Sequence, residues 1–142
     1  MTSNLILYGV LSSILAVVII SMVNRLSHYL RFRGMNSSNY TGFDLNGNKH
    51  EDRKYSVKFS FWRKKVVIKQ ISEKHGNWIS NIFLSNANPY IASGNYKYLT
   101  IHDGTWGTHE IVINREDEIL NITARSKSIP GEDKYLLKKG VN

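Results

Sequence analysis

Residues 55–72 read YSVKFSFWRKKVVIKQIS, and this stretch decides the fold class. From Tyr55 to Phe61, aromatic and aliphatic side chains alternate with Ser and Lys. A period of two is typical of a β-strand with one buried face. Arg63-Lys64 makes a short connection, and residues 65–72, dominated by β-branched side chains, continue as a second strand. The stretch therefore predicts two adjacent antiparallel strands.

Similar short segments recur along the rest of the chain, separated by turn residues. With the first pair they cover residues 40–45, 55–62, 65–72, 78–85, 90–99, 108–114, 118–124 and 134–138. This spacing predicts an all-β domain over residues 40–142, a meander of seven or eight antiparallel strands. We expect a small closed barrel because closure removes exposed strand edges, and a sandwich is the alternative.

The N-terminal region has a different composition. Residues 5–23 read LILYGVLSSILAVVIISMV, and no charged side chain occurs between Thr2 and Asn24. Nineteen helical residues rise about 28 Å, close to the hydrocarbon thickness of a bilayer. A cleaved signal peptide would need a basic segment before the run and a small-residue cleavage site after it, and neither is present. The run predicts a single uncleaved transmembrane helix.

The first charges after this helix predict its orientation. Arg25, Arg31 and Arg33 follow the apolar run, and no Lys or Arg precedes it. Basic residues next to a span stay on the cytoplasmic side, so we expect an external N-terminus and a cytoplasmic C-terminal domain. With Tyr29 and Phe32, these arginines are expected to contact the lipid headgroups. The absence of cysteine fits a reducing compartment.

Charge is unevenly distributed after the helix. We divide the chain into an anchor with a basic arm (residues 1–33), a Gly- and Ser-containing linker (34–39) and the β-domain (40–142). Residues 49–74 hold nine Lys or Arg and three acidic residues, whereas residues 75–142 hold seven of each. This basic segment suits an anionic leaflet or an anionic small ligand. The charges are spread along strands, so a nucleic-acid polymer is not expected as a partner.

Motifs for catalysis or metal binding are not found in the sequence. The five histidines have no metal-ligand spacing, and there is no cysteine to join them. His109 and Glu110 are neighbours on a predicted strand, so their side chains should point to opposite faces. We expect ordinary loop or surface histidines, no cofactor and no enzymatic activity.

Aromatic residues give the only candidate ligand site. Most should fill the core and the barrel ends, but Tyr96 and Tyr98 are two residues apart and should share one side of a strand. Small barrels hold one ligand, and aromatic faces beside cations suit a nucleobase and its phosphate. Lys69 and Arg125, in or next to predicted strands, are the candidate cations. These four residues form the predicted ligand site.

The order of segments resembles a known family. A span at Leu5–Val23, a basic arm at Arg25–Arg33 and strands through Tyr96-Lys97-Tyr98 and Thr108–Asn114 resemble the membrane effectors of bacterial cyclic-oligonucleotide antiphage systems. In that family a small barrel senses a cyclic dinucleotide, and the anchors assemble and disrupt the inner membrane. The resemblance implies a cyclic nucleotide ligand, a homo-oligomer and a bacterial inner-membrane location. The family usually has two membrane helices before the barrel, and one is visible here.

Two functional hypotheses follow. In the first, the protein is a sensor whose barrel binds an anionic small ligand and biases association of the anchors, in which Gly9, Ser13 and Ala16 lie near one helix face. In the second, it is a structural or accessory subunit of a membrane assembly, and the β-domain is a docking surface for another protein. An exposed strand edge would favour the second hypothesis, and a closed barrel with a polar cavity the first.

Overall fold

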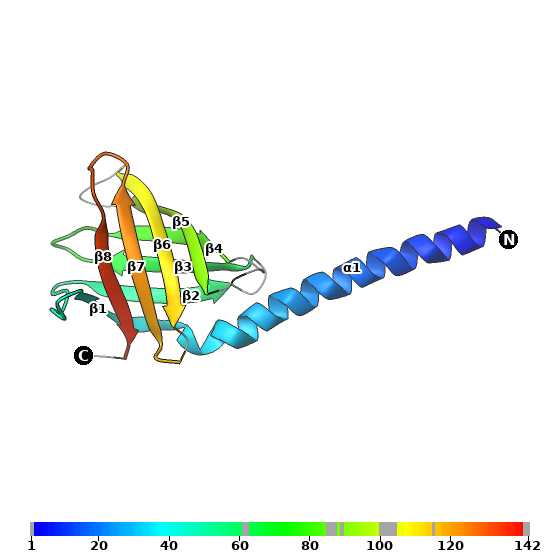
Figure 1. The fold of residues 1–142 in the computed structure, drawn as a ribbon, viewed down its shortest axis with the longest axis horizontal. Helices are drawn as coiled ribbons and strands as arrows, with labels where there is room; N and C mark the ends of the chain where they lie inside the picture. Colours follow the sequence, from blue (N-terminus) through cyan, green and yellow to red (C-terminus); the bar gives the residue numbers. More distant parts are fainter. Residues whose placement is uncertain are drawn as a thin grey trace.

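The computed structural model describes residues 2–60, 63–84, 88, 90–99, 105–114 and 116–140, without the side chains of Thr2 and His28. The described residues form one long helix, a short 3-10 turn and a set of strands (Figure 1). The elements are α1 (Thr2–Phe32), the 3-10 turn (Arg33–Met35), β1 (Ser37–Asp44), β2 (Lys54–Ser60), β3 (Lys65–Ile71), β4 (Trp78–Phe83), β5 (Ile91–Tyr98), β6 (Trp106–Asn114), β7 (Ile119–Ser126) and β8 (Asp133–Lys139).

The eight strands close into an antiparallel barrel in which each strand pairs with its neighbours in the sequence. Pairing of β1 with β8, from Tyr40 opposite Lys139 to Asp44 opposite Tyr135, completes the ring. The β2–β3 pair is regular from Lys54 to Ser60, whereas the β1–β2 register shifts between Ser37 and Tyr40. The predicted meander barrel is therefore confirmed.

Alternation along each strand fills the interior. In β6, for example, the side chains of His109, Ile111 and Ile113 are buried and those between them are exposed. The strand limits differ from the predicted ones mostly by one or two residues, and β1 begins three residues earlier than expected. Residues 61, 62 and 85, at the ends of two predicted strands, lie outside the described residues.

Helix α1 stands apart from the barrel along most of its length (Figure 1). It has 31 residues, which corresponds to about 46 Å. Its length and composition are sufficient to cross a membrane, and none of its most apolar stretch is buried against the described protein. The predicted single apolar helix is present.

The end of α1 closes one end of the barrel, which we call the helix-side end. Phe32 is fully buried and its ring stacks on that of Phe59, with centroids 4.8 Å apart. Tyr90 meets the Phe32 ring edge-on at 5.7 Å, and Met35 is 1% exposed. Phe32 is therefore part of the barrel core, and its expected place among lipid headgroups is corrected: the apolar interior, not the bilayer, removes this ring from water.

Residues 34–39 differ from the expected linker because they are fastened to the barrel. Asn36 Oδ1 accepts a hydrogen bond from the Phe59 amide at 2.7 Å. The Tyr40 hydroxyl donates to the Met35 carbonyl oxygen at 2.6 Å. β1 already begins at Ser37. Their polar composition predicted a loop, but side-chain hydrogen bonds satisfy the backbone and make the segment an ordered junction.

The Phe32 plug predicts a large loss of stability on truncation. Phe32→Ala should lower the free energy of unfolding by about 3–5 kcal/mol because it leaves a cavity among buried rings. Thermal unfolding of the full chain in detergent micelles, followed by near-UV circular dichroism, measures this. Leu30→Ala, two residues earlier and exposed, is the control. Equal, small shifts of the unfolding temperature in both variants would contradict a stabilising role of the buried Phe32.

Candidate functional site

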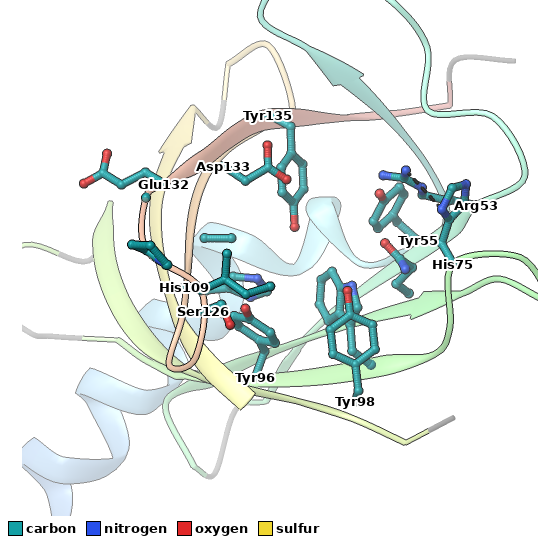
Figure 2. Close-up of a pocket in the computed structure, with 16 residues that line it drawn as sticks. Arg53, Tyr55, His75, Tyr96, Tyr98, His109, Ser126, Glu132, Asp133 and Tyr135 are labelled. Atoms are coloured by element: carbon teal, nitrogen blue, oxygen red, sulfur yellow. Dashed lines mark hydrogen bonds between the residues drawn. The ribbon is translucent and has the colours of Figure 1, made fainter. Parts of the chain in front are cut away.

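A cavity of about 440 Å³ lies at the opposite end of the barrel, which we call the far end. Figure 2 shows its walls, built from strand ends and from the β7–β8 connection. The lining residues are Arg53, Tyr55, Gln70, His75, Trp78, Tyr96, Tyr98, His109, Ala124, Ser126, Ile129, Pro130, Gly131, Glu132, Asp133 and Tyr135. The volume lies within the range of small-molecule sites, about 300–1,000 Å³.

One wall of the cavity is aromatic. Trp78 on β4 is opposite Tyr98 on β5 in the register, and Tyr96 lies two residues before Tyr98 on the same strand. The Tyr96 ring is 6.1 Å from the ring of Trp78 and 6.1 Å from that of Tyr98, edge-on to the latter. Two-residue spacing places both tyrosines on the inner face, as predicted from the sequence.

Gly107 makes room for this wall. It lies opposite Tyr96 in the β5–β6 register. A Cβ atom there would come within 2.8 Å of the Tyr96 hydroxyl oxygen and would also collide with the Arg125 carbonyl oxygen. The absence of a side chain therefore lets the Tyr96 ring lie over β6.

A second group of rings faces the first. Tyr55 and Tyr135 lie with centroids 6.3 Å apart, and Tyr55 is 6.2 Å from Trp78. Burial raises the pKa of Tyr55 to about 12, against the lowering effect of Arg53, and raises that of Tyr135 well above its usual value. Both phenols therefore keep their protons at neutral pH and remain hydrogen-bond donors.

His109 lies in the floor of the cavity and is 2% exposed. Its ring stacks on Tyr96 with centroids 4.3 Å apart and a 23° interplanar angle, and the Trp78 ring lies at 65° to it with centroids 4.7 Å apart. Desolvation lowers the pKa of His109 to about 3, so the imidazole is neutral. The expectation of a loop or surface histidine is wrong here.

The hydrogen bonds of His109 favour one tautomer. Nδ1 lies 2.9 Å from the Ser80 hydroxyl, which is 3.5 Å from the Asn95 carbonyl oxygen and donates to it. Because Ser80 has one hydroxyl proton, we assign the proton of the imidazole to Nδ1, from which it is donated to Ser80. Nε2 then carries a lone pair and is an acceptor.

Charged groups occupy the rim. Arg53 Nη2 lies 3.5 Å from His75 Nδ1, and the buried Nε of Arg53 has no hydrogen-bond partner among the described residues. Glu132 accepts a hydrogen bond from Arg125 Nε at 2.8 Å and turns away from the cavity, whereas Asp133 lies beside Tyr135 (Figure 2). Among the described residues that line the cavity, Arg53 supplies the guanidinium of the rim and Asp133 its inward carboxylate.

The structure brings together two of the four residues predicted to bind a ligand. Tyr96 and Tyr98 both line the cavity. Lys69 lies between the buried Ile68 and Gln70 and points outward. Arg125 also points outward, with its side chain 53% exposed and paired with Glu132. Neither cation reaches the interior, because neighbouring strand residues face opposite sides.

Sequence reasoning missed several lining residues, foremost His109, Trp78 and Arg53. For His109 a signal was available, since its alternation with Ile111 and Ile113 places all three on the same face. Arg53 precedes β2 and gave no periodic signal.

Of the other predicted membrane-interface residues, Tyr29 is on the exposed surface of α1 and Arg33 is exposed in the 3-10 turn. Arg31 lies with its guanidinium 5.7 Å from the Tyr90 ring, and Arg25 is half-buried. These residues lie around the junction between α1 and the barrel.

Comparisons of the chain with protein-family models, curated proteins and solved structures give no match.

The neutral state of His109 predicts a pH-dependent stability. The folded pKa is about 3 and the unfolded value is about 6.5, so the unfolded chain binds the extra proton between these values. Stability is fully present above pH 6.5 and falls with acidification toward pH 3. Between pH 7 and 4.5 the free energy of unfolding should drop by about 2–3 kcal/mol more in the native protein than in His109→Gln.

Urea unfolding of both proteins at the two pH values, in the same detergent, measures this difference. A parallel pH dependence in native protein and variant would contradict a buried neutral His109.

Proposed function

We propose that this protein is a single-pass, membrane-anchored sensor whose barrel binds a small planar ligand in the far-end cavity. One observation supports this proposal. Phe32 closes the helix-side end of the barrel, whereas an aromatic and polar cavity lies at the far end. A cyclic nucleotide is the candidate ligand that the resemblance to antiphage effectors suggests, and defence against phage is the proposed role.

The chemistry of the cavity favours a nucleobase. Stacked rings of Tyr96 and His109 provide flat apolar faces, which bind a planar heterocycle by stacking. The protonated phenol of Tyr135 supplies a donor, and Nε2 of His109 supplies an acceptor for the edges of the base. Arg53 at the rim is the cation for an anionic group, and its unpaired Nε offers a donor. This interior suits a ligand with one phosphate near Arg53.

The same geometry supports binding rather than catalysis. The Ser80–His109 pair has the distance of a nucleophile and its base, 2.9 Å. A base with a pKa of about 3 takes up a proton poorly at neutral pH, and Ser80 is fully buried. The pair therefore fits a structural hydrogen bond inside a binding site.

Strand β2 offers a connection between the cavity and the anchor. Tyr55 lines the cavity, and Phe59, four residues along the same inner face, stacks on Phe32 at the end of α1. Movement of β2 on ligand binding would change the packing of Phe59 on Phe32 and so the position of α1. Such a change would bias association of the anchors in a homo-oligomer. An exposed strand edge would favour the docking-subunit alternative, and the eight described strands instead close on one another.

A ligand screen tests the proposal. The full chain in detergent micelles is heated with nucleoside monophosphates, cyclic mononucleotides and cyclic dinucleotides. A ligand at 100 times its Kd adds about 2.7 kcal/mol, which raises Tm by several degrees in a domain of this size. Ala124→Phe, which fills the cavity, should abolish the shift, and the outward Lys69→Gln should keep it.

No shift with any of these compounds would remove nucleotides as the ligand. A shift of equal size in Ala124→Phe would place the binding site elsewhere on the protein.

The proposed location is the bacterial inner membrane, with the N-terminus outside and the barrel in the cytoplasm. The basis is the position of Arg25, Arg31 and Arg33 after the apolar run. Because the chain has no cysteine, Ser3→Cys and Ser128→Cys can be labelled individually. A membrane-impermeant maleimide should modify Ser3→Cys in intact cells and Ser128→Cys only after lysis. The reverse pattern would invert the topology.

A further inference from the structure

A second concavity lies on the outer face of the barrel, across β2, β3 and β4. We call it the outer groove, and its volume is about 630 Å³. Its lining residues are Asn36, Ser37, Ser38, Ser56, Val57, Lys58, Lys65, Val67, Lys69, Ile79 and Asn81. The far-end cavity shares none of them.

Three lysines surround the centre of the groove. Lys65 and Lys69 lie two residues on either side of Val67 along β3, and all three face outward. Lys58 on β2 is directly opposite Val67 in the register, and Asn81 on β4 is opposite it on the other side. Opposite residues have Cβ atoms about 5 Å apart and diagonal ones about 7–8 Å apart, so the three ammonium groups can reach one anion.

This cluster has no acidic counterpart. Among the described residues that line the groove there is no Asp or Glu, and Lys65 donates to the amide oxygen of Asn81 at 3.3 Å. Like charges on neighbouring strands repel, which disfavours the empty arrangement. Lys69, expected inside the barrel, belongs to this cluster instead.

The groove combines these cations with an apolar floor. Val67 lies between the lysines, and Ile79 is opposite Lys69 on β4. The hydroxyls of Ser37, Ser38 and Ser56 line the groove as well. A phosphate ester attached to an apolar chain matches this arrangement: the lysines and hydroxyls bind its oxygens, and the floor contacts its carbon atoms.

The position of the groove indicates the source of such a molecule. Its edge at Asn36–Ser38 begins four residues after the last residue of α1, Phe32. The stack of Phe32 on Phe59 holds the end of α1 against β2. In Figure 1 the arrowhead of β2 points toward the side on which α1 leaves the barrel. The helix-side end of the groove, with Asn36–Ser38 and Lys65, is therefore the part nearest to a membrane that α1 crosses.

We propose that the outer groove binds the phosphate headgroup of an anionic phospholipid from the membrane that α1 crosses. Anionic surfaces attract each nearby Lys or Arg, and three convergent lysines on one rigid sheet add these attractions without ordering a flexible segment. Lipid binding holds the helix-side ends of β2–β4 against the leaflet and leaves the far-end cavity open to the aqueous side. The proposal requires that α1 spans a membrane and is independent of the ligand in the cavity.

The test uses the full chain in nanodiscs of phosphatidylcholine alone or with about one third phosphatidylglycerol. A fluorophore on Asn39→Cys, the single cysteine, lies on an exposed position beside the groove and outside its lining. It is quenched by lipids that carry a spin label on the headgroup. We expect stronger quenching with phosphatidylglycerol, and a fall of about fivefold in the lipid association constant for each lysine neutralised. The triple variant K58Q/K65Q/K69Q should show the phosphatidylcholine value.

A matched control removes the same charge elsewhere. Lys97, Lys127 and Lys138 are absent from the groove lining, so K97Q/K127Q/K138Q should retain the phosphatidylglycerol effect. Equal quenching in both membranes, or an unchanged effect in K58Q/K65Q/K69Q, would overturn the proposal. Loss of the effect on addition of millimolar inorganic phosphate would show that the groove takes free phosphate instead of lipid. The nucleotide-induced Tm shift in the same variants reports separately on the cavity.

Discussion

Closure of the sheet by pairing of β1 with β8 is the constraint on which the rest of the structure depends. Once eight strands close, every second residue points into one interior that is just wide enough for side chains or one small ligand. Phe32, Met35 and Phe59 fill the helix-side end of that interior. The remaining inward positions at the far end are aromatic and polar, so a cavity persists there. The site is thus the part of the interior that apolar packing leaves unfilled.

The sequence was sufficient to predict the strands because the alternation of apolar and polar side chains is a local property. The same property placed Tyr96 and Tyr98 on one side, and both line the cavity. The charges of Lys69 and Arg125 predict a cationic ligand site, but the alternation excludes both side chains from the interior. Lys69, for example, lies next to the inward Ile68. Residue chemistry suggested a phosphate site inside the barrel, whereas the strand period assigns these cations to its outer surface.

Other parts of the structure depend on contacts between distant segments and had no local signal. The burial of Phe32 requires Phe59 and Tyr90, which are far from it in the sequence. A terminal helical residue followed by Gly and Ser is typical of an exposed helix end, so pattern alone favours a linker. The alternation of β6 places His109 inside, but its neutral state depends on Ser80 and on the depth of burial. Such features depend on which distant residues meet in the fold, and the period of a single strand does not identify those partners.

The barrel separates two kinds of electrostatic environment. Inside, burial keeps His109 neutral and Tyr135 protonated, and Arg53 and Asp133 both line the rim. A ligand with several phosphates would lose its hydration there without enough cations to replace it. Outside, the lysines of the outer groove remain solvated and can bind phosphate at little desolvation cost. The cavity is therefore suited to stacking, and the outer groove is the better site for phosphate. A nucleotide in the cavity and a lipid headgroup in the groove would not compete.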